Sequence, residues 1–104
     1  MNLIIGSHVS YNNKSQLLGS VKEALSYKAN TFMFYTGAPQ NTNRSVIEDS
    51  LTMEAYKLMK ENNIALEKVI VHAPYIVNLA NFNNFDFSVS FLINEVERCS
   101  TLGI

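Results

Sequence analysis

Three short apolar runs recur along the chain, and each opens into a polar loop. They cover residues 3–5, 31–35 and 69–71. The third run has no polar residue within it, which is typical of a strand buried on both faces. Because Pro74 lacks an amide hydrogen and restricts the residue before it, this strand must end near His72. The pattern therefore predicts three short strands, each followed by a loop.

A segment with helical periodicity follows each run. In every segment, apolar residues spaced three and four apart form one face. These faces are Leu17, Val21, Ala24 and Leu25, then Leu51, Ala55, Leu58 and Met59, and finally Leu92, Val96, Cys99 and Leu102. Ser15 and Ser50 are the expected N-caps, and Gly103 is the expected residue after the last helix. The resulting order, β-α-β-α-β-α, predicts an α/β fold with parallel strands joined by crossover helices.

The carboxyl ends of parallel strands meet at one edge of the sheet. His8 follows the first run, Gly37 follows the second and His72 ends the third. We therefore expect these three positions to converge. In α/β folds this edge holds ligands and catalytic groups, so it is the place to look for a functional site.

Composition indicates a soluble globular chain, with 47% hydrophobic and 16% charged residues. The single cysteine, Cys99, cannot form an intrachain disulfide and is interpreted as a small core residue. No signal peptide or membrane-spanning run is apparent, which favours a cytoplasmic location without a membrane partner. The net charge of −1 gives no basic footprint for nucleic acid. Contacts to nucleic acid would depend on loops, backbone amides and a metal site.

The chain ends just after a predicted helix, where a further strand is expected. Three βα units alone would leave an open parallel sheet with two unprotected edges. A complete barrel of such units needs about 250 residues, against the 104 present. We therefore expect residues 1–104 to be the N-terminal part of a single larger domain, with the chain truncated.

Three motifs follow one another along the chain: IGSHVS at residues 5–10, TFMFYTGAPQNT at residues 31–42, and HAPYIVNLA at residues 72–80. Together they resemble the endonuclease IV family of zinc-dependent apurinic/apyrimidinic endonucleases, also called deoxyribonuclease IV. Residues 97–104 resemble the helix that precedes the fourth strand in that family. The match extends over essentially the whole chain.

The resemblance implies a (β/α)8 TIM barrel, of which this chain supplies the first three βα units. It also implies a cluster of three Zn²⁺ ions at the carboxyl face and a monomeric enzyme. The substrate would be double-stranded DNA containing abasic sites. The phosphodiester on the 5′ side of the abasic sugar would be hydrolysed, leaving a 3′-hydroxyl and a 5′-deoxyribose phosphate. Metal ions suit this chemistry because they can bind a hydroxide nucleophile and neutralise the leaving oxygen.

The resemblance assigns His72 as a metal ligand. His8 would lie on the floor of the site and support it without binding metal directly. Taken from the sequence alone, His72 could also be a structural histidine hydrogen-bonded to a neighbouring loop. The family's other ligands would come from later strands. We therefore expect residues 1–104 alone to be inactive.

The resemblance also assigns DNA contacts to two loops. Tyr75 would insert into the base stack at the abasic gap. The loop with Gly37, Gln40 and Asn41 would enter the minor groove. Some family members have an arginine where this chain has Gln40, so the chain departs from the family there. Taken from the sequence alone, Gln40 and its neighbours could instead form an ordinary turn, and Tyr75 could be a loop aromatic that packs on a helix.

Two other classes of function fit parts of the pattern. A metal-dependent sugar isomerase or epimerase with a similar barrel would use the same edge of the sheet, but would not need Tyr75. A non-catalytic α/β fragment or doubly wound binding module is the other alternative. No GxGxxG or phosphate-binding loop follows any predicted strand, which counts against the binding module.

Overall fold

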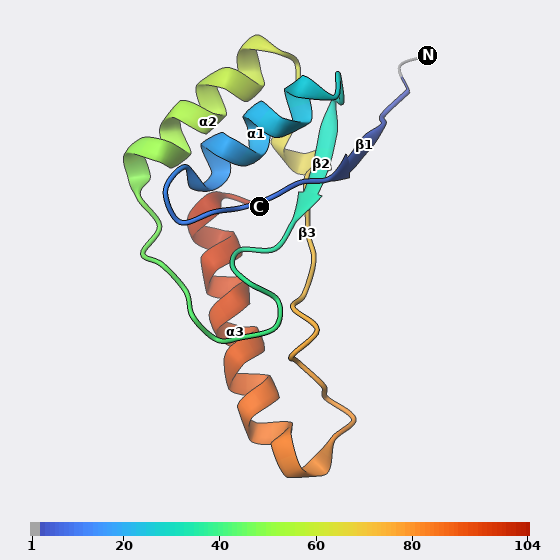
Figure 1. Ribbon diagram of the computed structural model, residues 1–104, viewed down its shortest axis with the longest axis vertical. Helices are drawn as coiled ribbons and strands as arrows, with labels where there is room; N and C mark the ends of the chain where they lie inside the picture. Colours follow the sequence, from blue (N-terminus) through green and yellow to red (C-terminus); the bar gives the residue numbers. More distant parts are fainter. Residues whose placement is uncertain (1–2) are drawn as a thin grey trace.

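The computed structural model describes residues 3–104 and has the predicted alternation of strands and helices (Figure 1). Three parallel strands form one sheet in the order β1-β2-β3. The strands are β1 (Gly6–His8), β2 (Thr31–Phe34) and β3 (Ile70–Val71). The helices are α1 (Gln16–Ser26), α2 (Asp49–Glu61) and α3 (Phe85–Leu102), with short 3-10 turns at Leu66–Lys68 and Phe82–Asn84. The α/β class and the parallel arrangement are therefore confirmed.

The first strand begins later than the apolar pattern predicts. Residues 3–5 are exposed, and pairing starts only where Gly6 lies opposite Thr31. Before that point the Asn30 side chain accepts a hydrogen bond from the Ile5 amide at 2.7 Å. A Cβ on Gly6 would lie 2.2 Å from the Thr31 carbonyl oxygen, so the close approach of β1 to β2 requires glycine. The apolar run at residues 3–5 therefore did not predict which residues of β1 pair with β2.

The central strand β2 presents two different faces. Phe32 and Phe34 are buried against the helices, whereas Met33 points to the opposite face. Figure 1 shows α1 and α2 lying together on one side of the strands. The buried apolar residues of this layer are Leu17, Val21, Ala24, Phe32, Phe34, Ala55, Met59 and Leu102. Packing of this core against β2 fixes the direction of the strand and hence the place where the loop after Phe34 begins.

The expectation that the third strand is buried on both faces is wrong. Val69 is buried, but the Ile70 side chain is 60% exposed. Ile70 lies beside Met33 in the sheet, and in the part of the chain that the structure describes no helix covers this face. The strand therefore alternates between a covered and an open face, even though its sequence is uniformly apolar.

The last helix buries its predicted apolar face only in part. Leu102 is buried, Leu92 and Cys99 are half-buried, and Val96 is 60% exposed. The fully buried residues are Ser88, Phe91, Glu95 and Leu102. Two of these are polar and have partners inside the protein, which a hydropathy pattern cannot reveal. The buried surface of α3 is therefore centred on a neighbouring stripe that includes polar residues.

The helix ends agree with the prediction in part. Ser15 is the N-cap of α1, but the Asn12 side chain makes the local bonds, accepting from the Ser15 amide at 2.8 Å. Ser50 is not a cap, because α2 begins at Asp49 and Glu48 precedes it. Gly103 ends α3 in the left-handed conformation, with φ of 80°, as expected.

None of the helices in residues 3–104 combines the length and apolar character needed to cross a bilayer.

Candidate functional site

Three loops meet at the carboxyl edge of the sheet. His8 is the last residue of β1. The amide of His72 donates to the Phe34 carbonyl at 2.9 Å, so pairing between β2 and β3 continues as far as this histidine. The Ile76 amide donates to the Pro39 carbonyl at 3.2 Å, which joins the loop after β3 to the loop after β2. The predicted convergence of the three strand ends is confirmed.

An aromatic ring separates the two histidines. The Tyr35 ring centroid lies 4.9 Å from that of His8 and 4.9 Å from that of His72. Its plane makes angles of 72° and 55° with the two imidazoles. Tyr35 follows Met33 by two residues and so projects from the same open face of the sheet. Period-two alternation along β2 could have identified Tyr35 from the sequence, but the apolar run hid it.

The His72 ring is held by a hydrogen bond to the backbone. Its Nδ1 lies 2.6 Å from the Ala73 carbonyl oxygen. Because a carbonyl can only accept, Nδ1 must donate the proton, and the lone pair is then on Nε2. Histidines that bind metals are commonly held in this way by a backbone carbonyl. The side chain is exposed, and Nε2 therefore suits a zinc ion.

The rest of a metal site is not assembled by this part of the chain. Within residues 3–104, no group of three or more histidine, cysteine, aspartate or glutamate side chains lies close enough to hold a metal ion. His8 is kept apart from His72 by the Tyr35 ring. The described residues therefore do not form a metal site by themselves.

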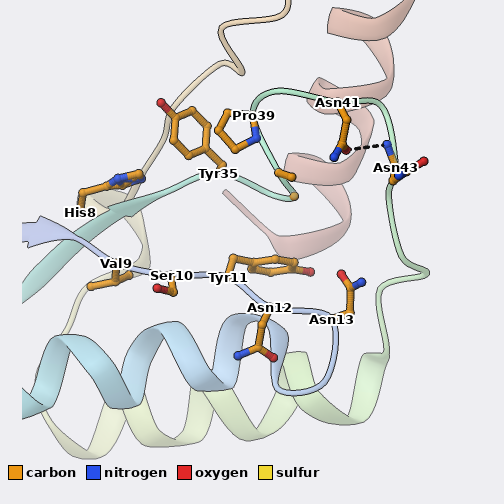
Figure 2. Close-up of a pocket in the computed structure, with 12 residues that line it drawn as sticks. His8, Val9, Ser10, Tyr11, Asn12, Asn13, Tyr35, Pro39, Asn41 and Asn43 are labelled. Atoms are coloured by element: carbon orange, nitrogen blue, oxygen red, sulfur yellow. Dashed lines mark hydrogen bonds between the residues drawn. The ribbon is translucent and has the colours of Figure 1, made fainter.

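A cleft of about 670 Å³ lies between the loop after β1 and the loop after β2 (Figure 2). Gly37 and Asn41 from the predicted DNA-binding loop line it, whereas Gln40 is outside it and exposed. No Lys, Arg, Asp or Glu side chain lines the cleft. Four asparagines and two tyrosines do: Asn12, Asn13, Asn41, Asn43, Tyr11 and Tyr35. This lining suits a ligand held by neutral hydrogen bonds and aromatic faces.

Tyr11 forms one wall of this cleft. Its ring stacks on Phe34 with centroids 5.6 Å apart, which ties the cleft to the core. Burial raises the pKa of the Tyr11 phenol, partly opposed by the positive charge of Arg98. The phenol therefore stays neutral at physiological pH and can donate a hydrogen bond.

The loop after β3 carries Tyr75, whose side chain is 66% exposed. Asn78 supports this loop, because its amide donates to the Ser88 hydroxyl of α3 at 3.0 Å. The Asn78 side chain also accepts a hydrogen bond from the Ala80 amide at 3.0 Å. The loop is thus anchored on the helix behind it, and Tyr75 is left accessible to a large ligand.

A buried polar cluster behind the site was not found from the sequence. Arg44 and Glu95 form an ion pair at 2.6 Å, with side chains only 6% and 5% exposed. The Thr36 hydroxyl donates to the same carboxylate at 2.6 Å. Arg98 donates to the Thr36 carbonyl at 2.8 Å. The spacing of Glu95 and Arg98 on one face of α3 was the only local signal of this cluster.

Cys99 lies partly buried beside this cluster. Burial raises the pKa of its thiol, and the nearby Glu95 carboxylate raises it further. A raised pKa keeps the thiol protonated and a poor nucleophile. This supports the interpretation of Cys99 as a structural residue.

The chain is similar in sequence to several curated proteins named "Probable endonuclease 4", although no family model matches it. The protein from Mesoplasma florum is 49% identical over 108 residues, a match that covers 97% of this chain and 37% of that protein. The protein from Halalkalibacterium halodurans is 55% identical over 107 residues, covering 99% and 35%. The protein from Bacillus velezensis is 54% identical over 105 residues, covering 97% and 34%. The chain therefore spans about a third of the length of these relatives.

The fold of the chain is also similar to that of a solved endonuclease IV. The crystal structure of endonuclease IV from Thermus thermophilus superposes with a TM-score of 0.78 at 23% identity. The match covers 96% of this chain and 38% of that chain. The three parallel βα units thus correspond to part of the endonuclease IV barrel. With about half of its residues identical along nearly its whole length to those of proteins named endonuclease 4, the chain closely resembles a part of the endonuclease IV family proteins.

Proposed function

We propose that this chain is part of a DNA-repair endonuclease that hydrolyses the phosphodiester on the 5′ side of abasic sites. The observation that carries the proposal is the meeting of His72 with the loops of Tyr75 and Gly37 at one sheet edge, in a chain about half identical to proteins named endonuclease 4. Residues 1–104 would be the N-terminal part of a single (β/α)8 domain. The complete protein would act as a monomer in the cytoplasm.

In this proposal His72 holds one of three zinc ions through Nε2. The Ala73 carbonyl keeps the ring proton on Nδ1 and fixes the orientation of the imidazole. Tyr35 packs against the ring and restricts its rotation, and His8 supports Tyr35 from the other side. Zinc, when bound, supplies Lewis-acid stabilisation of the phosphate charge. The other ligands would come from later strands of the complete domain.

DNA would be bound by loops and not by a basic surface. The chain has eight Lys and Arg residues against nine Asp and Glu residues. Gln40 gives the minor-groove loop a neutral tip, and the nearby Arg44 is buried against Glu95. Gly37 and Asn41 line the cleft beside this tip. Tyr75 would fill the gap left by the missing base.

The proposal is tested with the intact protein and two matched duplexes. One duplex carries a single tetrahydrofuran abasic analogue, and the other is undamaged. We expect incision of the first duplex only, on the 5′ side of the analogue, leaving a 3′-hydroxyl. Incision should be lost with a chelator and restored by zinc. Failure to cut the abasic duplex, together with isomerisation of free sugars, would instead support a metal-dependent isomerase or epimerase.

Tyr75→Ala should weaken the binding of abasic duplex by the intact protein. Stacking of an aromatic side chain on a base is worth about 1–3 kcal/mol, and the alanine variant loses it. Tyr75→Phe should be milder, because the ring and not the hydroxyl does the stacking. Fluorescence anisotropy with abasic and undamaged duplexes measures the effect. Equal affinity of the alanine variant and the wild type for abasic duplex would rule out the stacking role.

A further inference from the structure

The loop after β2 is folded around one buried arginine. The Arg44 guanidinium donates through Nη1 to three loop carbonyls, those of Ala38 at 3.1 Å, Asn41 at 3.1 Å and Asn43 at 2.8 Å. Its Nε donates to the Glu95 carboxylate on α3 at 2.6 Å. A single side chain thus gathers the loop backbone and attaches it to the helix. Figure 1 shows this loop running beside α3.

The arginine also fills the space inside the loop. A Cβ on Gly37 would lie 2.6 Å from Arg44 Cδ and 2.8 Å from its Nε. A side chain at position 37 would therefore displace the guanidinium from this position. On the other side the guanidinium lies over the Phe91 ring, 4.9 Å from its centroid. The loop conformation and the arginine position depend on each other.

The anchor for this arginine is itself held in place. Glu95 accepts from the Thr36 hydroxyl at 2.6 Å as well as from Arg44. Arg98 donates to the Thr36 hydroxyl at 3.1 Å and to its carbonyl at 2.8 Å. Loss of either member of a buried ion pair leaves an uncompensated charge, so the remaining partner must move toward water. Removing Arg44 or neutralising Glu95 should therefore release the loop.

We propose that the Arg44–Glu95 ion pair positions the 37–43 loop and thereby sets the affinity of the intact protein for DNA. This inference rests on the proposed function, in which that loop enters the minor groove. Arg44 is a positioning residue, because its side chain is 6% exposed and its Nε and Nη1 donors are directed to Glu95 and to the loop, whereas its buried Nη2 makes no hydrogen bond. A loop that is ordered before binding loses less conformational entropy when it meets DNA.

The test compares Arg44→Met and Glu95→Gln with wild type in the intact protein. Lys57→Met is the control, because it removes one positive charge from an exposed position on α2. If the released loop adopts the bound conformation about a tenth of the time, the Kd for abasic duplex rises about tenfold. The single-turnover rate at saturating enzyme should stay close to that of wild type, and Lys57→Met should bind normally. Arg44→Lys should not restore affinity, since an ammonium group cannot replace the planar fork of donors.

A second measurement does not depend on DNA. Hydrogen exchange of the loop amides, including Asn41, whose amide donates to the Ala38 carbonyl, should be faster in both variants. Exchange in helix α1 should not change, which shows that the variants are folded. If Arg44→Met does not fold, the near-isosteric Glu95→Gln still provides both measurements.

The outcomes separate this inference from the proposed function. Faster loop exchange with weaker binding supports the inference. An unchanged Kd in both variants overturns it, whether or not loop exchange changes. Failure of the wild-type protein to bind abasic duplex would overturn the proposed function itself. In that case neither the two variants nor the Lys57→Met control would have a wild-type Kd to be compared with.

Discussion

His72→Ala in the intact protein should remove one equivalent of zinc and abolish most incision of abasic duplex. The imidazole would supply one coordinate bond of about 2.0–2.1 Å, and alanine cannot replace it. Loss of even an outer partner of a metal ligand costs about 10- to 100-fold in metal affinity or activity, so loss of the ligand should cost more. Metal content of the purified variant, measured beside activity, tests the assignment directly.

His8→Ala is the matched control for this experiment. His8 lies at the same edge of the sheet and contacts the same Tyr35 ring, but from the side opposite His72. We expect its removal to leave the zinc content unchanged. Full zinc content in His72→Ala would contradict the ligand assignment, and loss of zinc in His8→Ala would show that His8 either binds metal or is needed, through Tyr35, to hold the His72 ring.

The arrangement of the chain could be predicted from local signals. Helical periodicity and short apolar runs are encoded within a few residues, and the direction of parallel strands then determines which loops meet. Pro74 marks the end of the third strand, which is why His72 could be placed at the carboxyl edge of the sheet. The same reasoning correctly placed His8 and the Gly37 loop at this edge.

What could not be predicted depends on contacts between distant parts of the chain. Arg44 and Glu95 are separated by 51 residues, and each looks like an ordinary surface charge in its own segment. Glu95 is buried with this partner whereas the apolar Val96 beside it is exposed, so the predicted face of α3 was only partly right. Ile70 is exposed for a related reason, because the sequence pattern cannot show that one face of the sheet is left uncovered in this part of the chain.

The site itself was predicted unevenly. The position of His72 follows from the strand pattern, but the orientation of its ring depends on the Ala73 carbonyl, which no pattern indicated, and on Tyr35, which alternation along β2 could have indicated. The roles of His72 and His8 toward metal, and of Tyr75, Gly37, Gln40 and Asn41 toward DNA, came from the family resemblance. Those roles stay predictions, for which the structure supplies geometry and the variants above supply tests.

Phe34→Ala should reduce the free energy of unfolding of the intact protein by about 3–5 kcal/mol, the usual cost of truncating a buried phenylalanine. The Phe34 side chain is 0% exposed, and its ring packs 5.6 Å from Tyr11 and 5.7 Å from Phe32. Removing it leaves a cavity between the central strand and its helices. The hydrogen bond that the His72 amide donates to the Phe34 carbonyl involves only backbone atoms, so the variant retains it. Urea unfolding of the variant and wild type measures the loss.

Phe82→Ala is the control for Phe34→Ala, since it removes the same atoms from a side chain that is 96% exposed. A residue already in water gains no burial on folding, so this change should alter stability by less than about 0.5 kcal/mol. Similar losses from the two substitutions would show that Phe82 is buried in the complete protein or that Phe34 is not part of its core. A large loss from Phe34→Ala alone would show that Phe34, on which the Tyr11 ring of the cleft stacks, belongs to the core between β2 and the helices α1 and α2.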